Sequence, residues 1–252
     1  MTRSGAVSAM RRPAPSPDDA RLLRHPSFDG FAPLLLPWDD RTYDERLPLA
    51  HIESLLPYHT HVDPATVVVG LNRIIDGAAD ARIVFCRFYT EAQAREAPAR
   101  SKTVLFFFRG RPGAPFAVIA PGGGFSYVAS VHEGFPDAVA ISSKSYNAFV
   151  PKCLAGQGRG GGRGHGGGDL VHPDKRGLSG RWRHGLLAVG NSADARMAAA
   201  IGSHGVARFE GGSAPKTSAV VMAYTGYSDY AVAEPPRSSW SASGMASPRR
   251  QS

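Results

Sequence analysis

GNSADAR, at residues 190–196, contains one serine, Ser192, between an apolar run and an alanine-rich segment. Residues 186–189 are apolar, as a short buried strand is, and residues 193–201 are rich in alanine, the best helix former. The sequence therefore predicts a strand, a tight turn and a helix that meet at Ser192. Such a turn exposes the serine as a candidate nucleophile and directs N–H groups of the helix start at the oxygen of a substrate. A turn serine without a catalytic role is the alternative.

A glycine-rich loop is predicted about 70 residues upstream. Residues 116–120 form an apolar run typical of a buried strand, and Gly122, Gly123 and Gly124 follow almost directly. Bare backbone N–H groups in such a loop can converge on a developing oxyanion, and each contributes roughly 3 kcal/mol to stabilising the transition state. The sequence therefore predicts an oxyanion site from the N–H groups of Gly123, Gly124 and Ala193.

The glycine loop and the serine turn, in this order, resemble the α/β-hydrolase family, in which an HGGG-type loop precedes a G-x-S-x-G turn. The closer resemblance is to its esterase and lipase branch, which includes acetyl and feruloyl esterases, and it covers about residues 26–152 and 190–236. It implies acylation of Ser192 by a small-molecule ester, without a cofactor or a metal. Two positions depart from the family pattern. Pro121 replaces the histidine of the loop, and Asp194 replaces the second glycine of the turn, where we expect its side chain to crowd the elbow.

The predicted fold class is α/β, with a doubly wound, mostly parallel sheet that has helices on both faces and is incomplete at the C-terminus. The first two strands are expected to be an antiparallel entry to the sheet. Strands are predicted at residues 82–89, 103–109, 116–120, 146–150, 186–189 and 219–224, and helices at residues 63–76, 136–143 and 193–203. Asp63 should cap the first helix and Gly77 should end it.

The domain is predicted to span residues 26–236, with an irregular covering segment at residues 26–57 and a disordered lead-in at residues 1–25. The alternation of strands and helices stops at residues 152–189, which are predicted to be a Gly/Arg-rich irregular insert or a frame-shifted stretch. Its Gly/Arg segment, residues 156–168, contains nine glycines. The alternation stops again at residues 237–252, for which we predict an aberrant tail without a strand of the expected kind. One hypothesis for both stretches is a shifted reading frame, which sequencing of the gene would test.

The catalytic partners of Ser192 are hard to find in the sequence. In the family, an acid and then a histidine follow the serine, but the last histidine here, His204, comes only twelve residues later. Asp229 is a candidate acid, although the resemblance places the acid one strand later and a solvated loop carboxylate is the alternative. His132 and Glu133 follow the glycine loop and either border the pocket or form a structural hydrogen-bonded pair. We therefore expect impaired activity.

Two non-enzymatic functions remain as alternatives. The first is a non-catalytic α/β-hydrolase-like protein that binds or scaffolds. The second is RNA binding by the Gly/Arg segment, suggested by the net charge of +8. Residues 1–24, 152–189 and 237–252 together carry 15 of the 29 Lys and Arg but only 4 of the 21 Asp and Glu, so the remaining chain is slightly acidic. The Gly/Arg segment also lacks interleaved aromatic residues, and we do not expect a nucleic-acid partner.

A metal site and a membrane segment are not expected either. His59, His61 and Asp63 have the spacing of some zinc ligands, but Asp63 before Pro64 is better explained as a helix cap. The longest apolar runs fall far short of the ~20 residues that cross a bilayer, and no signal peptide is evident, so a cytoplasmic location is expected. Cys86 and Cys153 are predicted to be free thiols. The oligomeric state stays open.

Overall fold

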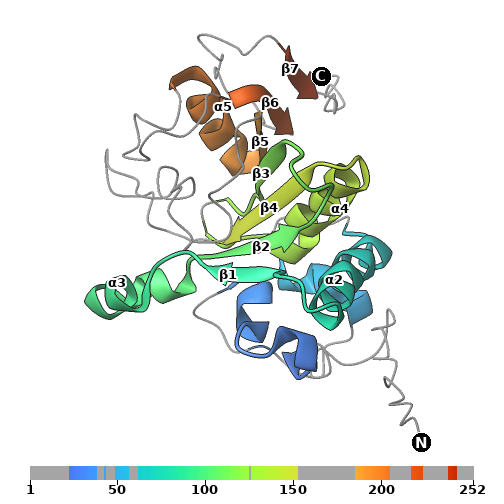
Figure 1. Ribbon diagram of the computed structural model, residues 1–252, viewed down its shortest axis with the longest axis vertical. Helices are drawn as coiled ribbons and strands as arrows, with labels where there is room; N and C mark the ends of the chain where they lie inside the picture. Colours follow the sequence, from blue (N-terminus) through green and yellow to red (C-terminus); the bar gives the residue numbers. More distant parts are fainter. Residues whose placement is uncertain are drawn as a thin grey trace, which may run out of the picture.

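The computed structural model describes residues 23–38, 43, 49–56, 62–124, 126–152, 185–204, 217–223 and 238–242, and its centre is one twisted sheet (Figure 1). Its strands are β1 (Phe85–Arg87), β2 (Val104–Phe108), β3 (Phe116–Ala120), β4 (Asn147–Lys152), β5 (Leu186–Asn191), β6 (Thr217–Ala223) and β7 (Ser238–Ala242). They lie in the order β1-β2-β4-β3-β5-β6-β7. Only β2 is antiparallel to its neighbours, β1 and β4. The predicted antiparallel entry to a mostly parallel sheet is therefore confirmed.

Helices cover both faces of the sheet, as predicted. The main helices are α2 (Pro64–Ala79), α4 (Phe135–Ser143) and α5 (Ala195–His204), and the short α3 (Glu91–Glu96) follows β1. Ala188 and Val189 are neighbours on β5, so their side chains point to opposite faces. Val189 belongs to the core cluster that includes α2 and α4, whereas Ala188 packs with Ala198 of α5. Figure 1 accordingly shows α5 well apart from the pair α2 and α4.

The segment before α2 belongs to the main core. It contains the short 3-10 helices η1 (Pro26–Phe28), η2 (Ala32–Leu35) and η3 (Leu49–Leu55), so its backbone is irregular, as predicted. Phe28, Leu35 and Ile52 are nevertheless completely buried, and all three belong to the core cluster that α2 and the sheet form. This segment therefore supplies core side chains in addition to covering the domain. Residues 1–22, which include most of the predicted lead-in, lie outside the described part.

Helix α2 begins as predicted and ends later than predicted. The Asp63 side chain accepts a hydrogen bond from the Ala65 N–H at 2.9 Å, and Pro64 occupies the first helical position. The helix continues past Gly77 to Ala79, so the prediction that Gly77 ends it is wrong. Gly77 serves packing instead, because a Cβ there would lie 2.5 Å from Cγ1 of Val84.

Removal of the cap should weaken the start of α2. We expect Asp63→Ala to lower the free energy of unfolding by about 1 kcal/mol, because one N–H of the first turn loses its acceptor. Urea denaturation followed by circular dichroism measures this change. Asp63→Ser retains a capping oxygen and is the matched control, so an equal loss in both variants would contradict a capping role.

Strand β7 corrects the prediction for the tail. A strand of the expected kind was not predicted within residues 237–252, but Ser238–Ala242 pairs in parallel with β6, from Ala219↔Ser238 to Ala223↔Ala242. Strand propensity depends strongly on context, and the open edge of β6 supplies the hydrogen-bonding partners for a serine-rich segment. Residues 153–184 and 243–252 lie outside the described part, and the reading-frame hypothesis stays a prediction.

The other element bounds follow the predictions within a few residues. The clearest difference is β1, which is much shorter than the predicted strand at residues 82–89. The remaining short elements are the 3-10 helix η4 (Pro98–Lys102), the short π-helix η5 (Ser130–Gly134) and the 3-10 helix η7 (Ser192–Asp194). Among the described residues, every helix is too short or too polar to cross a lipid bilayer.

Candidate active site

Ser192 lies where β5 passes into η7 and then into α5, as the sequence predicts. Its backbone has a φ of 51°, a left-handed conformation that residues other than glycine seldom adopt. A strained turn between strand and helix is the structural feature that exposes a nucleophilic serine at the carboxyl end of the strands. The side chain of Ser192 is accordingly only partly buried.

Gly190 allows the turn to close. A Cβ at this position would lie 2.3 Å from the carbonyl oxygen of Asp194, so the start of the helix approaches the strand more closely than any side chain permits. Asp194 was expected to crowd the elbow because it replaces a glycine. Ser192 nevertheless has the strained conformation, and the close contact involves the backbone of Asp194.

The glycine loop lies beside Ser192. Ala120 pairs with Gly190, so β3 and β5 end together, and a Cβ at Gly122 would lie 2.9 Å from the Cβ of Ser192. Gly123 and Gly124 have φ values of 153° and 58°, which favour glycine. The sequence predicted the loop but did not show that its first glycine, Gly122, is the one that adjoins Ser192.

His132 and Glu133 are adjacent on η5 but contact different parts of the molecule. The Glu133 carboxylate accepts a hydrogen bond from the Gly122 N–H at 2.7 Å, and this bond fixes the first glycine of the loop. His132 is buried, and its Nε2 lies 3.2 Å from the carbonyl oxygen of Ile52 in η3. Of the two predicted pocket residues, Glu133 is therefore the one placed next to the glycine loop and Ser192.

The elbow is surrounded by carboxyl groups. Burial, together with the nearby charge of Glu133, raises the pKa of Asp194 to about 7. Burial also raises the pKa of Asp137, an effect that a hydrogen bond from Asn191 opposes and the charge of Glu133 reinforces. Asn191 donates this bond through Nδ2 at 2.7 Å, and its buried Oδ1 has no partner among the described residues. Ionised carboxylates here would oppose an oxyanion, whereas protonated ones would not.

The structure leaves several candidates untested. Asp229, His59 and His61 lie outside the described residues. Within the described part of the chain, no three His, Cys, Asp or Glu side chains come together as a metal site requires. Asp63 is the cap of α2, as described above. Cys86 Sγ lies 3.9 Å from the carbonyl oxygen of Leu105, and Cys153 lies outside the described residues.

Three features together define the α/β-hydrolase fold: the strand order with only β2 antiparallel, the glycine loop after β3, and the serine elbow after β5. The fold that the resemblance implied is thereby confirmed. No protein-family model matches the chain, and a comparison with curated proteins finds no relative.

Several solved structures are similar in fold. The α/β hydrolase MGS-M1 from a Medee basin deep-sea metagenome has 19% identity and a TM-score of 0.38 over 53% of this chain and 57% of its own. The esterase Est2 of Thermogutta terrifontis has 15% identity and a TM-score of 0.36 over 47% and 48%. Esterase B of Lactobacillus rhamnosis has 15% identity and a TM-score of 0.35 over 64% and 58%. This chain thus spans about half to three fifths of their lengths, and the similarity concerns the fold alone.

Proposed function

We propose that this chain is a serine hydrolase of the carboxylesterase and lipase type with impaired activity, whose substrates are small acyl esters. The observation that supports this best is the strained elbow itself. Ser192, with a φ of 51°, is directly beside the first glycine of the loop, Gly122. A left-handed residue costs about 1–3 kcal/mol. Ala81 and Ser145 have this conformation too, so the support comes from the place of Ser192, between β5 and α5 and beside the glycine loop.

In the proposed reaction, Oγ of Ser192 attacks the acyl carbon, and its proton leaves with the alcohol group. The N–H groups of Gly123, Gly124 and Ala193 hold the oxyanion while the acyl-enzyme forms, and water then releases the acid. Gly122 has a supporting role, because its N–H is already donated to Glu133. The first glycine therefore positions the loop, and the next two are left to contact the substrate.

Slow turnover is part of the proposal. Between Ser192 and Ser252 the last histidine is His204, only twelve residues after the serine, so the proposal assigns Ser192 no histidine as proton acceptor. Loss of that acceptor costs on the order of a millionfold in turnover in another serine hydrolase. The carboxyl groups of Glu133 and Asp194 oppose the oxyanion as well, when they are ionised.

Covalent labelling separates the nucleophile from turnover. We expect an alkyl fluorophosphonate to label the protein slowly at Ser192, and p-nitrophenyl acetate to be hydrolysed at nearly the rate of the Ser192→Ala variant. Ser143→Ala, an exposed serine of α4, is the matched control and should label normally. Labelling that persists in Ser192→Ala would contradict the nucleophile. Fast hydrolysis that depends on Ser192 would contradict the proposed impairment but would support Ser192 as the nucleophile.

A non-catalytic binding protein is the second candidate. It is favoured by the three carboxyl groups around the elbow, because an anionic intermediate would be poorly stabilised among them. In that case a small ester should raise the melting temperature without being hydrolysed, and the increase should be lost when a bulky side chain fills the site, as in Ser192→Phe. RNA binding by residues 156–168 stays a prediction, since these residues lie outside the described part.

A further inference from the structure

Asp137 and Asn191 form a buried contact beside the elbow that the proposed reaction does not use. Asn191 is the last residue of β5, directly before Ser192, and it is only 1% exposed. Its Nδ2 donates a hydrogen bond of 2.7 Å to Oδ2 of Asp137, which comes 54 residues earlier in the chain. This contact joins the strand that carries the candidate nucleophile to helix α4.

The geometry of the sheet explains why these two side chains meet. Side chains alternate along a strand, so Asn191 faces the same side of β5 as Val189. Val189 packs into the core cluster that includes Phe135 and Ala138 of α4. Asp137 lies in the first turn of the same helix, where the helix dipole favours a carboxylate. The strand and the helix therefore each present one half of the contact.

The contact is poorly explained by stability alone. Oδ1 of Asn191 is buried and has no partner among the described residues, so only the donor side of the amide is satisfied. A buried acceptor without a donor costs free energy, and this cost offsets much of what the bond to Asp137 contributes. Placement of the next residue, Ser192, is a role that such an amide can have.

The conformation of Ser192 requires a restraint of this kind. Its φ of 51° is unfavourable, and a strained conformation persists only where the surrounding structure holds it. Gly190 permits the close approach of α5, and the side chain of Asn191 ties down the residue between Gly190 and Ser192. Without this tie the peptide before Ser192 could rotate, and the serine would leave its place beside Gly122.

The same helical segment also holds the glycine loop. Glu133 of η5 accepts the hydrogen bond from the Gly122 N–H, and α4 continues directly from η5. Glu133 and Asp137 are four residues apart, which is about one helical turn. One segment therefore contacts the loop through its first carboxyl group and the elbow through its second.

We propose that Asp137 is a positioning residue for the nucleophile, which through Asn191 holds Ser192 in its left-handed conformation beside the glycine loop. The proposal rests on the proposed function, because it concerns the reactivity of Ser192. It assigns to η5 and α4, on one face of the sheet, the task of keeping the serine and the loop at a fixed separation.

Fluorophosphonate labelling of the full chain tests the proposal. Asp137→Leu and Asn191→Leu keep a side chain of similar shape, and each should slow the labelling of Ser192 about tenfold, because a small misplacement of reacting groups is costly. The double variant should be no slower than the slower single variant, since both changes remove one contact. Asp137→Asn should rescue the rate, because its amide oxygen can still accept the bond from Asn191.

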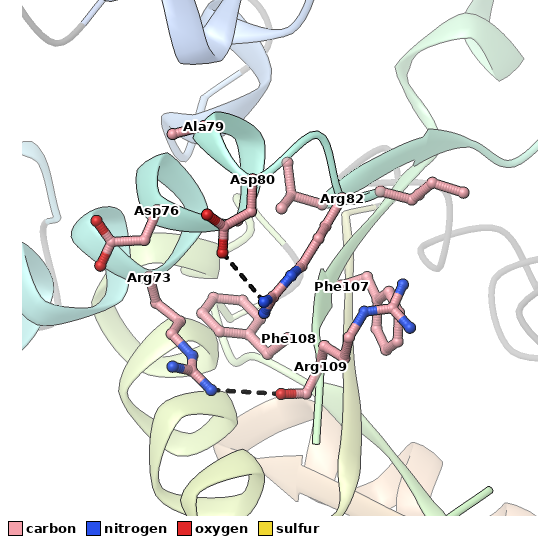
Figure 2. A pocket seen from close by; sticks show the side chains of 11 residues that line it. Arg73, Asp76, Ala79, Asp80, Arg82, Phe107, Phe108 and Arg109 are labelled. Carbon is pink, nitrogen blue, oxygen red and sulfur yellow. Dashed lines mark hydrogen bonds and ion pairs between the residues drawn. The ribbon is translucent and has the colours of Figure 1, made fainter. Parts of the chain in front are cut away.

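Two matched controls lie away from the elbow. Asn147→Leu removes another buried asparagine, at the start of β4, which bonds to the backbone of Gly110, Arg111 and Ala114. It should lower the melting temperature and leave the labelling rate unchanged. Asp80→Leu removes a carboxylate that lies 3.1 Å from Arg82 at the end of α2 (Figure 2), and it should also leave the rate unchanged.

Three labelling results would overturn the proposal. Labelling of Asp137→Leu at the rate of the parent would show that Asp137 does not position the serine. An equal loss in Asn147→Leu would show that the rate follows stability in general. A loss in the double variant equal to the product of the two single losses would show that Asp137 and Asn191 act separately. Melting curves check that each variant is folded.

A crystal structure of Asp137→Leu distinguishes this proposal from the proposed function. In that variant the φ of Ser192 should leave the left-handed region, and a φ still near 51° would overturn the positioning role whether or not Ser192 reacts. Labelling that persists in Ser192→Ala would instead contradict the nucleophile, and the crystal structure would still decide whether Asp137 holds the elbow.

Discussion

Asp194→Asn is expected to be more stable than the parent protein above pH 7 and nearly equal to it near pH 4. The pKa of Asp194 is raised from 3.8 to about 7 by burial and by Glu133. Between these values the folded protein keeps a proton that the unfolded chain has lost, so stability falls as the pH rises and then levels off above about 7. For a pKa shift of this size, the upper limit on the stability lost as the pH rises is on the order of 4 kcal/mol. Asparagine has the same shape and no charge, so it should remove this loss.

Urea denaturation at pH 5 and pH 8 measures this effect. Asp29→Asn, which removes an exposed carboxylate, is the matched control and should change the two free energies of unfolding equally. If Asp194→Asn raises the free energy of unfolding no more at pH 8 than at pH 5, the carboxylate of Asp194 is not the source of the pH dependence. Asp137 also has a raised pKa and should leave part of the pH dependence in place.

The second large effect is expected for Gly190→Ala, which should destabilise the protein by about 3 kcal/mol or more. The new Cβ would lie 2.3 Å from the carbonyl oxygen of Asp194 and 2.8 Å from Cα of Ala195. Both are backbone atoms that cannot rotate away, so α5 must move outward from the sheet. Such a movement would also displace Ser192 from the glycine loop.

The free energy of unfolding and the rate of fluorophosphonate labelling should therefore fall together in Gly190→Ala. Gly30→Ala is the matched control, since a Cβ there meets nothing within 4 Å and only the φ of 77° is unfavourable. That variant should lose about 1–2 kcal/mol and keep the labelling rate of the parent. A Gly190→Ala variant with unchanged labelling would contradict the close packing of helix and strand at the elbow.

Local signals account for most of the fold that the sequence predicted. Short apolar runs before Gly122 and before Ser192 marked β3 and β5, and alanines marked α5, because period and composition act within a few residues. The cap at Asp63 was predicted for the same reason. The failures concern contacts between distant residues. Gly77 lies inside α2 because of Val84, and β7 exists because the edge of β6 offers it hydrogen bonds.

The candidate site divides in the same way. The serine turn and the glycine loop were predicted from their own residues. The hydrogen bond from Gly122 to Glu133 was not, because the loop and the π-helix η5 meet only when the chain folds back. The raised pKa of Asp194 also depends on the tertiary structure, because its causes are burial and, second, the charge of Glu133 on another element.

By itself, the sequence determined the succession of strands and helices along the chain, the elbow at Ser192 and the glycine loop. Dihedral preferences and hydrophobic period are properties of short segments. Only the tertiary structure decided which glycine adjoins the serine and which carboxyl groups lie close together beside it. Packing, desolvation and charge depend on distances in space, and these are fixed only when segments far apart in the chain come together.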